Sequence, residues 1–360
     1  MDRTNDLRIL GIQPLTSPRA LKADLPLTEE SARTVVESRG VVDAIIDHRD
    51  PRMLAVVGPC SIHDPAAAID YARRLNVLRR EIEDRIFVVM RIYFEKPRTR
   101  LGWRGLILDP HLDGTYDVQF GLRTARSILL EITGMGLPVG SEMLDPIVPQ
   151  YTSDLLAWAS IGARTTESQT HREMASGLSM PVGLKNGTDG SIETAIDALS
   201  SSRGPHSFIG IDQDGQTAVF GTSGNTAGHI ILRGGRNGPN YHDEFVEDAC
   251  RLLNAAGFPS TVMIDCSHSN SLRRPTRQEK VLQSVIRQRG EGQTAIIGFM
   301  LESNLREGNQ PVAALKDLEY GISITDACMG WEQTERALRR AYGELGEAES
   351  GHALPGGKPG

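Results

Sequence analysis

The fold of this 360-residue chain is limited most by a regular alternation of short apolar runs and longer amphipathic runs. The short runs are rich in β-branched and aliphatic residues, as in strands, while the longer runs repeat apolar residues at helical spacing. Strands that alternate with helices form a parallel sheet, because each helix returns the chain to the side where the next strand begins. The predicted strands are Met53 to Val57, Ile86 to Ile92, Leu137 to Ser141, Ala159 to Ala163, Pro181 to Leu184, His229 to Leu232, Thr261 to Ile264 and Ala295 to Leu301.

Eight such units across residues 51–345 predict an α/β fold of the closed (β/α)8, or TIM, barrel type. A doubly wound sheet fits less well, since it is expected to carry a glycine fingerprint after its first strand. We expect residues 1–50 to form an N-terminal extension with a helix from Pro26 to His48. A Thr-x-x-Glu sequence at Thr276 predicts a capping box for the helix that follows it.

Two further segments depart from the strand and helix rhythm. Residues 206–221 contain two β-rich runs around Asp212-Gln213-Asp214-Gly215, which predicts a β-hairpin inserted before the sixth barrel strand. Residues 346–360 are rich in Gly and Pro toward their end and are expected to form a disordered tail.

The charge balance and the distribution of apolar residues argue against two classes of protein. A net charge of −7 and a pI near 5.8 do not suit a nucleic-acid binder, which needs a positive surface. No run approaches the roughly 20 apolar residues of a membrane span, and the N-terminus lacks the apolar core of a signal peptide. The four dispersed cysteines, Cys60, Cys250, Cys266 and Cys328, suit reduced thiols, so we expect a cytoplasmic protein.

A charged or reactive side chain lies at the C-terminal end of each predicted strand. Active sites of (β/α)8 barrels lie at this end, because all the parallel strands end on one face. Burying many charged groups around one opening is tolerable only if they bind ions or each other. In chain order these residues are Cys60, Arg91, Glu142, Arg164, Lys185, Arg233, His268 and Glu302.

The strand-end residues divide into an anion-binding set and a metal-binding set. The basic residues, joined by Lys96 and Arg98, suit a ligand with phosphate and carboxylate groups, since the guanidinium fork matches both. A thiolate, an imidazole and carboxylates suit a borderline divalent transition ion. Taken singly, each residue is explained as well by a surface salt bridge, a buried apolar cysteine or a solvated charge. The metal-binding set is Cys60, His268, Glu302 and Asp326, and His63 is placed to contact either a metal or a phosphate.

Six motifs together resemble the microbial type I 3-deoxy-D-arabino-heptulosonate 7-phosphate (DAHP) synthases, of the subgroup regulated by aromatic amino acids. The resemblance runs from about Pro26 to Tyr342. The motifs are Gly58 to Asp64 (GPCSIHD), Lys96 to Thr99 (KPRT), Gly162 to Ser168 (GARTTES), Lys185 to Gly190 (KNGTDG), Ile231 to Gly235 (ILRGG) and Asp265 to His268 (DCSH).

The resemblance implies condensation of phosphoenolpyruvate with D-erythrose 4-phosphate, the first step of the shikimate pathway. It implies a divalent transition ion (Mn, Fe, Co or Zn) on the metal-binding set, and an erythrose 4-phosphate site near Lys96, Arg98 and Thr99. Lys96, His268 and Glu142 are the implied catalytic residues. The implied phosphoenolpyruvate contacts are Arg91, Lys96, Arg164, Lys185 and Arg233, and Ala163 is a further expected substrate-binding residue.

The resemblance also implies feedback inhibition and self-association. The effector site is expected to combine the inserted hairpin with the N-terminal segment of a neighbouring subunit, in a dimer or a tetramer. Gly210 and its neighbours resemble tyrosine-sensitive members more than phenylalanine-sensitive ones. The expected effector residues are Pro149, Gln150, Ser179, Phe208 and Gly210.

Two other functions compete with this interpretation. A 3-deoxy-octulosonate 8-phosphate synthase would use a five-carbon aldose phosphate, but we read the KPRT motif as favouring the shorter sugar. A non-catalytic sensor of aromatic amino acids would have no need of the complete metal-binding and anion-binding sets. Comparing aldose phosphates as substrates would distinguish the first alternative from DAHP synthesis. Steady release of phosphate would exclude the second alternative.

Overall fold

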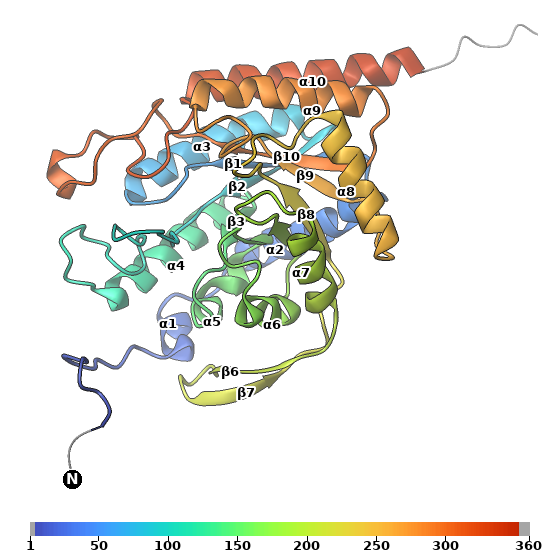
Figure 1. The fold of residues 1–360 in the computed structure, drawn as a ribbon. Coiled ribbons are helices and arrows are strands. Elements are labelled where there is room, and N and C mark those ends of the chain that lie inside the picture. The colour runs from blue at the N-terminus through green and yellow to red at the C-terminus, as the bar shows by residue number, and fades with distance from the viewer. Residues whose placement is uncertain (1–3, 353–360) are drawn as a thin grey trace, which may run out of the picture.

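The computed structural model describes residues 4–352, and eight parallel strands close into one barrel (Figure 1). Each predicted strand is present, with ends that shift by at most two residues. The predicted (β/α)8 fold is therefore confirmed. The barrel strands are β1 (Met53–Gly58), β2 (Ile86–Arg91), β3 (Val139–Glu142), β4 (Trp158–Ile161), β5 (Val182–Lys185), β8 (Gly228–Leu232), β9 (Val262–Asp265) and β10 (Ile296–Glu302).

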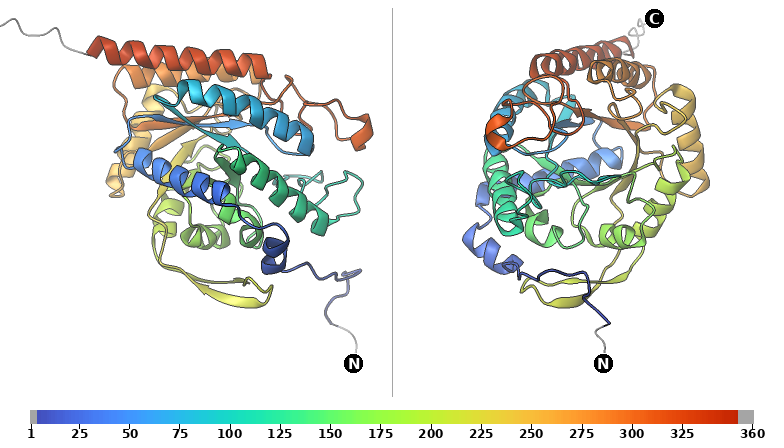
Figure 2. Two further views of the ribbon diagram at one scale, coloured as in Figure 1. Left: turned by 180° about the vertical axis from the view of Figure 1, so that it is seen from behind. Right: turned by 60° about the vertical axis from the view of Figure 1, so that its left-hand side comes forward.

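Helices surround the barrel, as Figure 2 shows in two further views. Their apolar side chains belong to the same buried cluster as those of the strands. Each of these helices lies between consecutive strands, apart from α10, which follows β10. The outer helices are α3 (Pro65–Ile82), α4 (Val118–Gly134), α6 (Gln169–Gly177), α7 (Glu193–Arg203), α8 (Asp243–Ala255), α9 (Gln278–Gly290) and α10 (Trp331–His352). Shorter elements are α1 (Pro18–Asp24), α5 (Pro149–Thr152), and the 3-10 turns η1 (Ser153–Leu155), η2 (Pro275–Arg277) and η3 (Leu315–Asp317).

The N-terminal helix α2 (Glu29–Ile46) packs against the residues that fill the barrel interior. It starts after Thr28, whose side chain accepts a hydrogen bond from Ser31 N. Val42, Ile45 and Ile46 share one apolar cluster with interior residues of the strands. We infer that α2 closes the end of the barrel opposite the C-terminal ends of the strands. The interior residues are Leu54, Val56, Val89, Trp158, Ile231, Met263, Ile297 and Met300.

The inserted hairpin consists of β6 (Ser207–Ile211) and β7 (Thr217–Gly221), an antiparallel pair before the sixth barrel strand. Figure 1 shows it below the barrel, on the same side as α1 and the N-terminal segment. Arg19 N donates to Gln213 O at 2.7 Å, and Lys22 Nζ donates to Gln213 Oε1 at 3.1 Å. The N-terminal segment of the chain therefore supports the tip of the hairpin.

Two local predictions are wrong. Pro275 starts the 3-10 turn η2, so α9 begins only at Gln278 and Thr276 makes no capping hydrogen bond. Helix α10 continues through His352, so the chain is still helical where residue 346 was expected to begin a disordered tail. The rest of that predicted tail, residues 353–360, lies outside the described residues. Within residues 4–352, no helix combines the length and the apolar character that crossing a membrane requires.

Candidate active site

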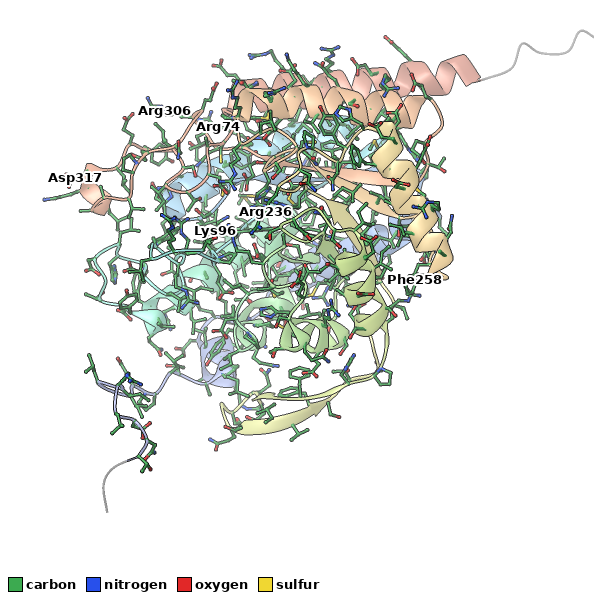
Figure 3. All side chains as sticks on the ribbon, viewed as in Figure 1. Arg74, Lys96, Arg236, Phe258, Arg306 and Asp317 are labelled. Carbon is green, nitrogen blue, oxygen red and sulfur yellow. The ribbon has the colours of Figure 1, made fainter. Side chains whose placement is uncertain are left out.

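A cavity of about 840 Å³ opens at the C-terminal ends of the barrel strands. Seven of the eight strand-end residues line it, and only Cys60 lies behind the surface, fully buried. Lys96 and Arg236 also line it, and both are labelled in the middle of the molecule in Figure 3. The remaining predicted site residues on its wall are Arg98, Thr99, Ala163 and Asp326.

The same alternation that fills the barrel also places the charged groups at its opening. Side chains two positions apart on a strand point to the same face, so each interior position repeats every second residue. On β10, apolar Met300 is followed two residues later by Glu302, and on β9 Met263 is followed by Asp265. The last inward-facing side chain of each strand can therefore be polar, while the inward-facing side chains before it form the apolar interior of the barrel.

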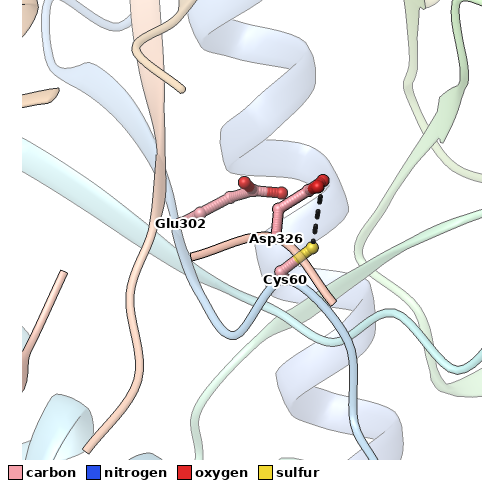
Figure 4. A group of neighbouring side chains, drawn as sticks. All are labelled: Cys60, Glu302 and Asp326. Carbon is pink, nitrogen blue, oxygen red and sulfur yellow. Dashed lines mark hydrogen bonds between the residues drawn. The ribbon is translucent and has the colours of Figure 1, made fainter. Parts of the chain in front are cut away.

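Cys60, Glu302 and Asp326 form a group suited to a divalent ion (Figure 4). One ligand atom from each lies within 4.8 Å of the others, and Cys60 Sγ donates to Asp326 Oδ2 at 3.6 Å. Burial and the Glu302 carboxylate raise the pKa of Cys60 to about 12. A coordinated cation reverses this effect, because thiols deprotonate when they bind a metal. One sulfur and two carboxylates fit a borderline divalent transition ion.

The fourth expected ligand, His268, lies beside this group but not within it. Its Nε2 is 3.8 Å from Glu302 Oε1, and its Nδ1 is 2.8 Å from Asp265 Oδ2. The latter distance is within the range of an ion pair, but Nδ1 is among the buried atoms that make no hydrogen bond in the described part of the chain. His268 also has a φ of +50°, a conformation that is uncommon outside glycine. By contrast, His63 is buried and belongs to neither the three-residue group nor the cavity wall.

Two buried ion pairs hold charge beneath the cavity. Arg91 Nη2 donates to Glu302 Oε1 at 2.9 Å, and Lys185 Nζ donates to Asp265 Oδ2 at 2.8 Å. Burial opposes ionisation of Glu302, but His268 and Arg91 lower its pKa to about 2. Likewise, His268 and Lys185 overcome the burial of Asp265 and hold its pKa well below the usual range. Both carboxylates are therefore negatively charged at neutral pH.

Arg164 and Arg233 lie on the cavity wall without a carboxylate partner among the ion pairs of residues 4–352. Arg164 Nε donates to Thr99 Oγ1 at 3.2 Å, and Arg233 Nη1 donates to Gly234 O at 3.4 Å. Burial lowers the pKa of Arg233, but the group stays cationic because its normal pKa is so high. Unpaired guanidinium groups around one cavity fit an anionic ligand.

Sequence reasoning missed Glu95, a carboxyl group buried beside the predicted anion-binding set. Its side chain is 2 % exposed, and its Oε1 has no hydrogen-bond partner. Burial, together with the negative charges of Asp145 and Glu142, raises its pKa to about 8. The available signal was an acidic residue between the apolar run Ile92 to Phe94 and the KPRT motif. Arg236 and Arg273, which also line the cavity, were missed because they lie in loops beyond the strand ends.

The structure joins one expected effector residue, Gln150, to the hairpin that carries two others, Phe208 and Gly210. Gln150 Oε1 accepts a hydrogen bond from Gln213 Nε2 at 2.8 Å, which joins α5 to the hairpin. Phe208 stacks on Phe220 with ring centroids 5.5 Å apart. A methyl group added to Gly210 would lie 3.0 Å from the Phe220 ring. Pro149 is buried at the start of α5, and Ser179 is exposed between α6 and β5.

The barrel and its cavity define a class of protein: a (β/α)8 enzyme that combines a metal-binding group with an anion-binding wall. Residues 25–339 match the DAHP synthetase I family. The chain is 52 % identical over 345 residues to the Tyr-sensitive phospho-2-dehydro-3-deoxyheptonate aldolase of Salmonella typhimurium, covering 96 % of this chain and 97 % of that one. It is also 52 % identical over 338 residues to the Phe-sensitive enzyme of Escherichia coli, covering 94 % and 96 %.

The solved structures agree with the sequence comparison. The phospho-2-dehydro-3-deoxyheptonate aldolase of Francisella tularensis superposes with a TM-score of 0.92 and 46 % identity, covering 94 % of this chain and 98 % of that one. The chain belongs to the DAHP synthetase I family.

Proposed function

We propose that this chain joins phosphoenolpyruvate to D-erythrose 4-phosphate, giving DAHP and inorganic phosphate as the first step of aromatic amino-acid biosynthesis. One observation carries this conclusion. Glu302 and Asp326, which form a group with the buried Cys60, line the same cavity as guanidinium groups that have no carboxylate partner among the ion pairs of residues 4–352. A reaction between two phosphorylated substrates, one of them an aldehyde, can use both features: the guanidinium groups bind the phosphates, and a metal ion polarises the aldehyde.

The cavity wall is proposed to hold the two substrates in distinct places. The phosphoenolpyruvate site contains Arg91, Lys96, Ala163, Arg164, Lys185 and Arg233. Arg98 and Thr99 take the phosphate of erythrose 4-phosphate, next to the Arg164 side chain that contacts Thr99. Fixing both substrates in one orientation turns a bimolecular reaction into a step within a single complex. The residues that would hold a divalent transition ion, which supplies Lewis acidity to the aldehyde, are Cys60, His268, Glu302 and Asp326.

The bond changes follow from this arrangement. The π electrons of the C2–C3 double bond of phosphoenolpyruvate form a bond from C3 to the aldehyde carbon, which leaves C2 electron-deficient. The π pair of the aldehyde moves to its oxygen, which then takes up a proton. Lys96, whose Nζ lies 3.1 Å from Cys60 Sγ, is placed to donate that proton. Glu142 orients a water molecule that adds to C2 and loses one proton. The bond from C2 to the phosphate oxygen then breaks, which releases phosphate, and the C2 hydroxyl loses its proton to leave the ketone.

We also propose that tyrosine regulates the enzyme and that the chain self-associates. The hairpin, α5 and the N-terminal segment of a neighbouring subunit would form a tyrosine site that includes Gln150, Phe208 and Gly210, with Pro149 and Ser179 at its edge. Exposed apolar side chains on the N-terminal segment and on the hairpin support self-association as a dimer or tetramer. These are Leu7, Ile9, Leu10, Ile12, Ile209 and Val219. The four free cysteines support a cytoplasmic location.

A substrate panel tests the activity. The wild-type protein is incubated with phosphoenolpyruvate and either erythrose 4-phosphate or arabinose 5-phosphate, and the sugar products are identified by mass spectrometry. A seven-carbon product formed much faster than an eight-carbon product supports the proposal. A preference for the five-carbon sugar would assign the sibling activity, and no product with either would reject condensation.

A further inference from the structure

Three buried asparagines meet behind the anion-binding wall, where β5, β8 and β9 end. Asn186 directly follows β5, Asn240 lies in the loop after β8, and Asn270 lies in the loop after β9. Their exposed fractions are 0 %, 5 % and 2 %, and none of them lines the cavity. We call this group the asparagine clamp.

The asparagine clamp binds the backbone on both sides of Arg233. Asn186 Oδ1 accepts from Arg233 N at 2.8 Å, and Asn186 Nδ2 donates to Gly234 O at 3.0 Å. Asn240 Oδ1 accepts from Gly234 N at 2.6 Å, while Asn270 Nδ2 donates to Leu232 O at 3.1 Å. Side-chain amides thus bind four of the five backbone polar groups from Leu232 O to Gly234 O, at the point where β8 ends.

The three amides also bind one another and the neighbouring strand. Asn240 Nδ2 donates to Asn186 Oδ1 at 3.3 Å, and Asn240 N donates to Asn270 Oδ1 at 2.8 Å. Asn270 Nδ2 also donates to Asp265 O at 2.9 Å. Asp265 is the carboxylate that contacts both Lys185 and His268. The asparagine clamp therefore connects the backbone around Arg233 to the backbone of Asp265, whose carboxylate contacts Lys185 and His268.

Gly234 belongs to the same local structure as the asparagine clamp. Its φ of +73° is unfavourable for other residues, and an added Cβ would lie 3.0 Å from Asn270 Oδ1 and 2.7 Å from Ser269 Cβ. The tight turn directs the chain away from the barrel immediately after Arg233. Without amide partners, these buried peptide groups would have no hydrogen-bond partner, which destabilises a folded chain.

We propose that the asparagine clamp positions the Arg233 guanidinium for phosphoenolpyruvate, and that it acts through Arg233 rather than through contact with substrate. This inference rests on the proposed role of Arg233. The clamp fixes the Cα of Arg233 while leaving its guanidinium unpaired with any carboxylate in the described part of the chain. An arginine that is held before the ligand arrives loses less freedom on binding.

A double-mutant cycle tests the proposal, with Asn240→Ala measured in the wild-type and Arg233→Ala backgrounds. In the wild type we expect Asn240→Ala to raise the KM for phosphoenolpyruvate about tenfold and to change the KM for erythrose 4-phosphate less than about twofold. In the Arg233→Ala background the same substitution should change phosphoenolpyruvate use less than about threefold, because residues that act together are not additive. Direct binding of phosphoenolpyruvate, followed by calorimetry without the second substrate, should show the same pattern.

The matched control is Asn76→Ala, which removes a buried asparagine on α3 whose Nδ2 donates to Met135 O at 3.0 Å. It should leave both KM values unchanged. Equal effects of Asn240→Ala in both backgrounds, or on both substrates, would overturn the positioning role. If Asn240→Ala does not fold, Asn186→Ser is measured in the same cycle and interpreted in the same way. If Arg233→Ala alone leaves the affinity for phosphoenolpyruvate unchanged, Arg233 does not bind this substrate, and the positioning role of the asparagine clamp is rejected too. The proposed overall activity would not be affected, because the substrate panel tests it separately.

Discussion

Arg91 and Glu302 form an ion pair at 2.9 Å with both side chains only 1 % exposed. A buried pair of this kind contributes little net stability, because removing two charges from water offsets their attraction. Its role is better explained by the Glu302 charge, which the pair helps to maintain next to Cys60 and Asp326. Arg91 belongs to the anion-binding set and Glu302 to the metal-binding set. The ion pair therefore links these two sets electrostatically.

Cys60→Ser should weaken binding of a divalent transition ion by about tenfold or more while the fold is retained, since the thiolate is lost and the barrel core is unchanged. Metal content after dialysis, measured by plasma mass spectrometry together with the melting temperature, checks this. Cys250→Ser, at a half-buried cysteine on α8, is the control. Normal metal content at normal stability would remove Cys60 from the site.

Arg98→Ala should mainly raise the KM for erythrose 4-phosphate, whereas Arg164→Ala and Lys185→Ala should mainly impair use of phosphoenolpyruvate. Losing one charge-assisted contact to a phosphate is worth about 2 kcal/mol, or roughly thirtyfold. Steady-state kinetics with each substrate varied in turn measures the difference. Similar effects of all three substitutions on both substrates would argue that the two anion sites are not separate.

The barrel and most of the candidate site were predictable from sequence for one reason. Strand periodicity determines which residue ends each strand on the inward side, so Arg91 and Glu302 could be placed on the same opening without a structure. Contacts between loops have no such period. Asn186, directly after β5, contacts Asn240 in the loop after β8 across 54 positions, and only the folded chain brings them together. Glu95 was missed because its effect depends on burial, which a short sequence pattern does not reveal.

His229 makes stability depend on pH. It lies inside the barrel, where its Nε2 accepts from Trp158 Nε1 at 3.0 Å, and burial lowers its pKa to about 4. Between pH 6.5 and 4 the unfolded chain binds a proton that the folded chain does not, so stability falls as the pH falls through this window. From pH 7 to pH 4.5, wild type should lose about 2 to 3 kcal/mol more unfolding free energy than His229→Gln.

Urea unfolding at the two pH values, followed by tryptophan fluorescence, measures this difference. His242→Gln, at an exposed histidine before α8, should behave as the wild type does. If His229→Gln shows the same loss of stability toward acid as the wild type, His229 does not carry a depressed pKa in the folded protein.

Tyrosine should inhibit the enzyme, and Gly210→Ala should reduce that inhibition without changing the uninhibited rate. The added methyl would lie 3.0 Å from the Phe220 ring and disturb the stack with Phe208. Gly221→Ala on the other hairpin strand is the control, because its added methyl meets nothing within 4 Å. Initial rates with tyrosine, phenylalanine and tryptophan decide between effectors. Inhibition by phenylalanine alone would reject tyrosine, and no response to any of them would reject the effector site.

The most direct test of the account is the initial rate of phosphate release from phosphoenolpyruvate with erythrose 4-phosphate, before and after metal removal. The untreated enzyme should release phosphate and form DAHP in equal amounts. After chelation the rate should fall by at least about a hundredfold, because the aldehyde loses its Lewis acid. Adding back a divalent transition ion should restore it. Full activity in protein shown to be free of metal would contradict the proposed role of Cys60, His268, Glu302 and Asp326.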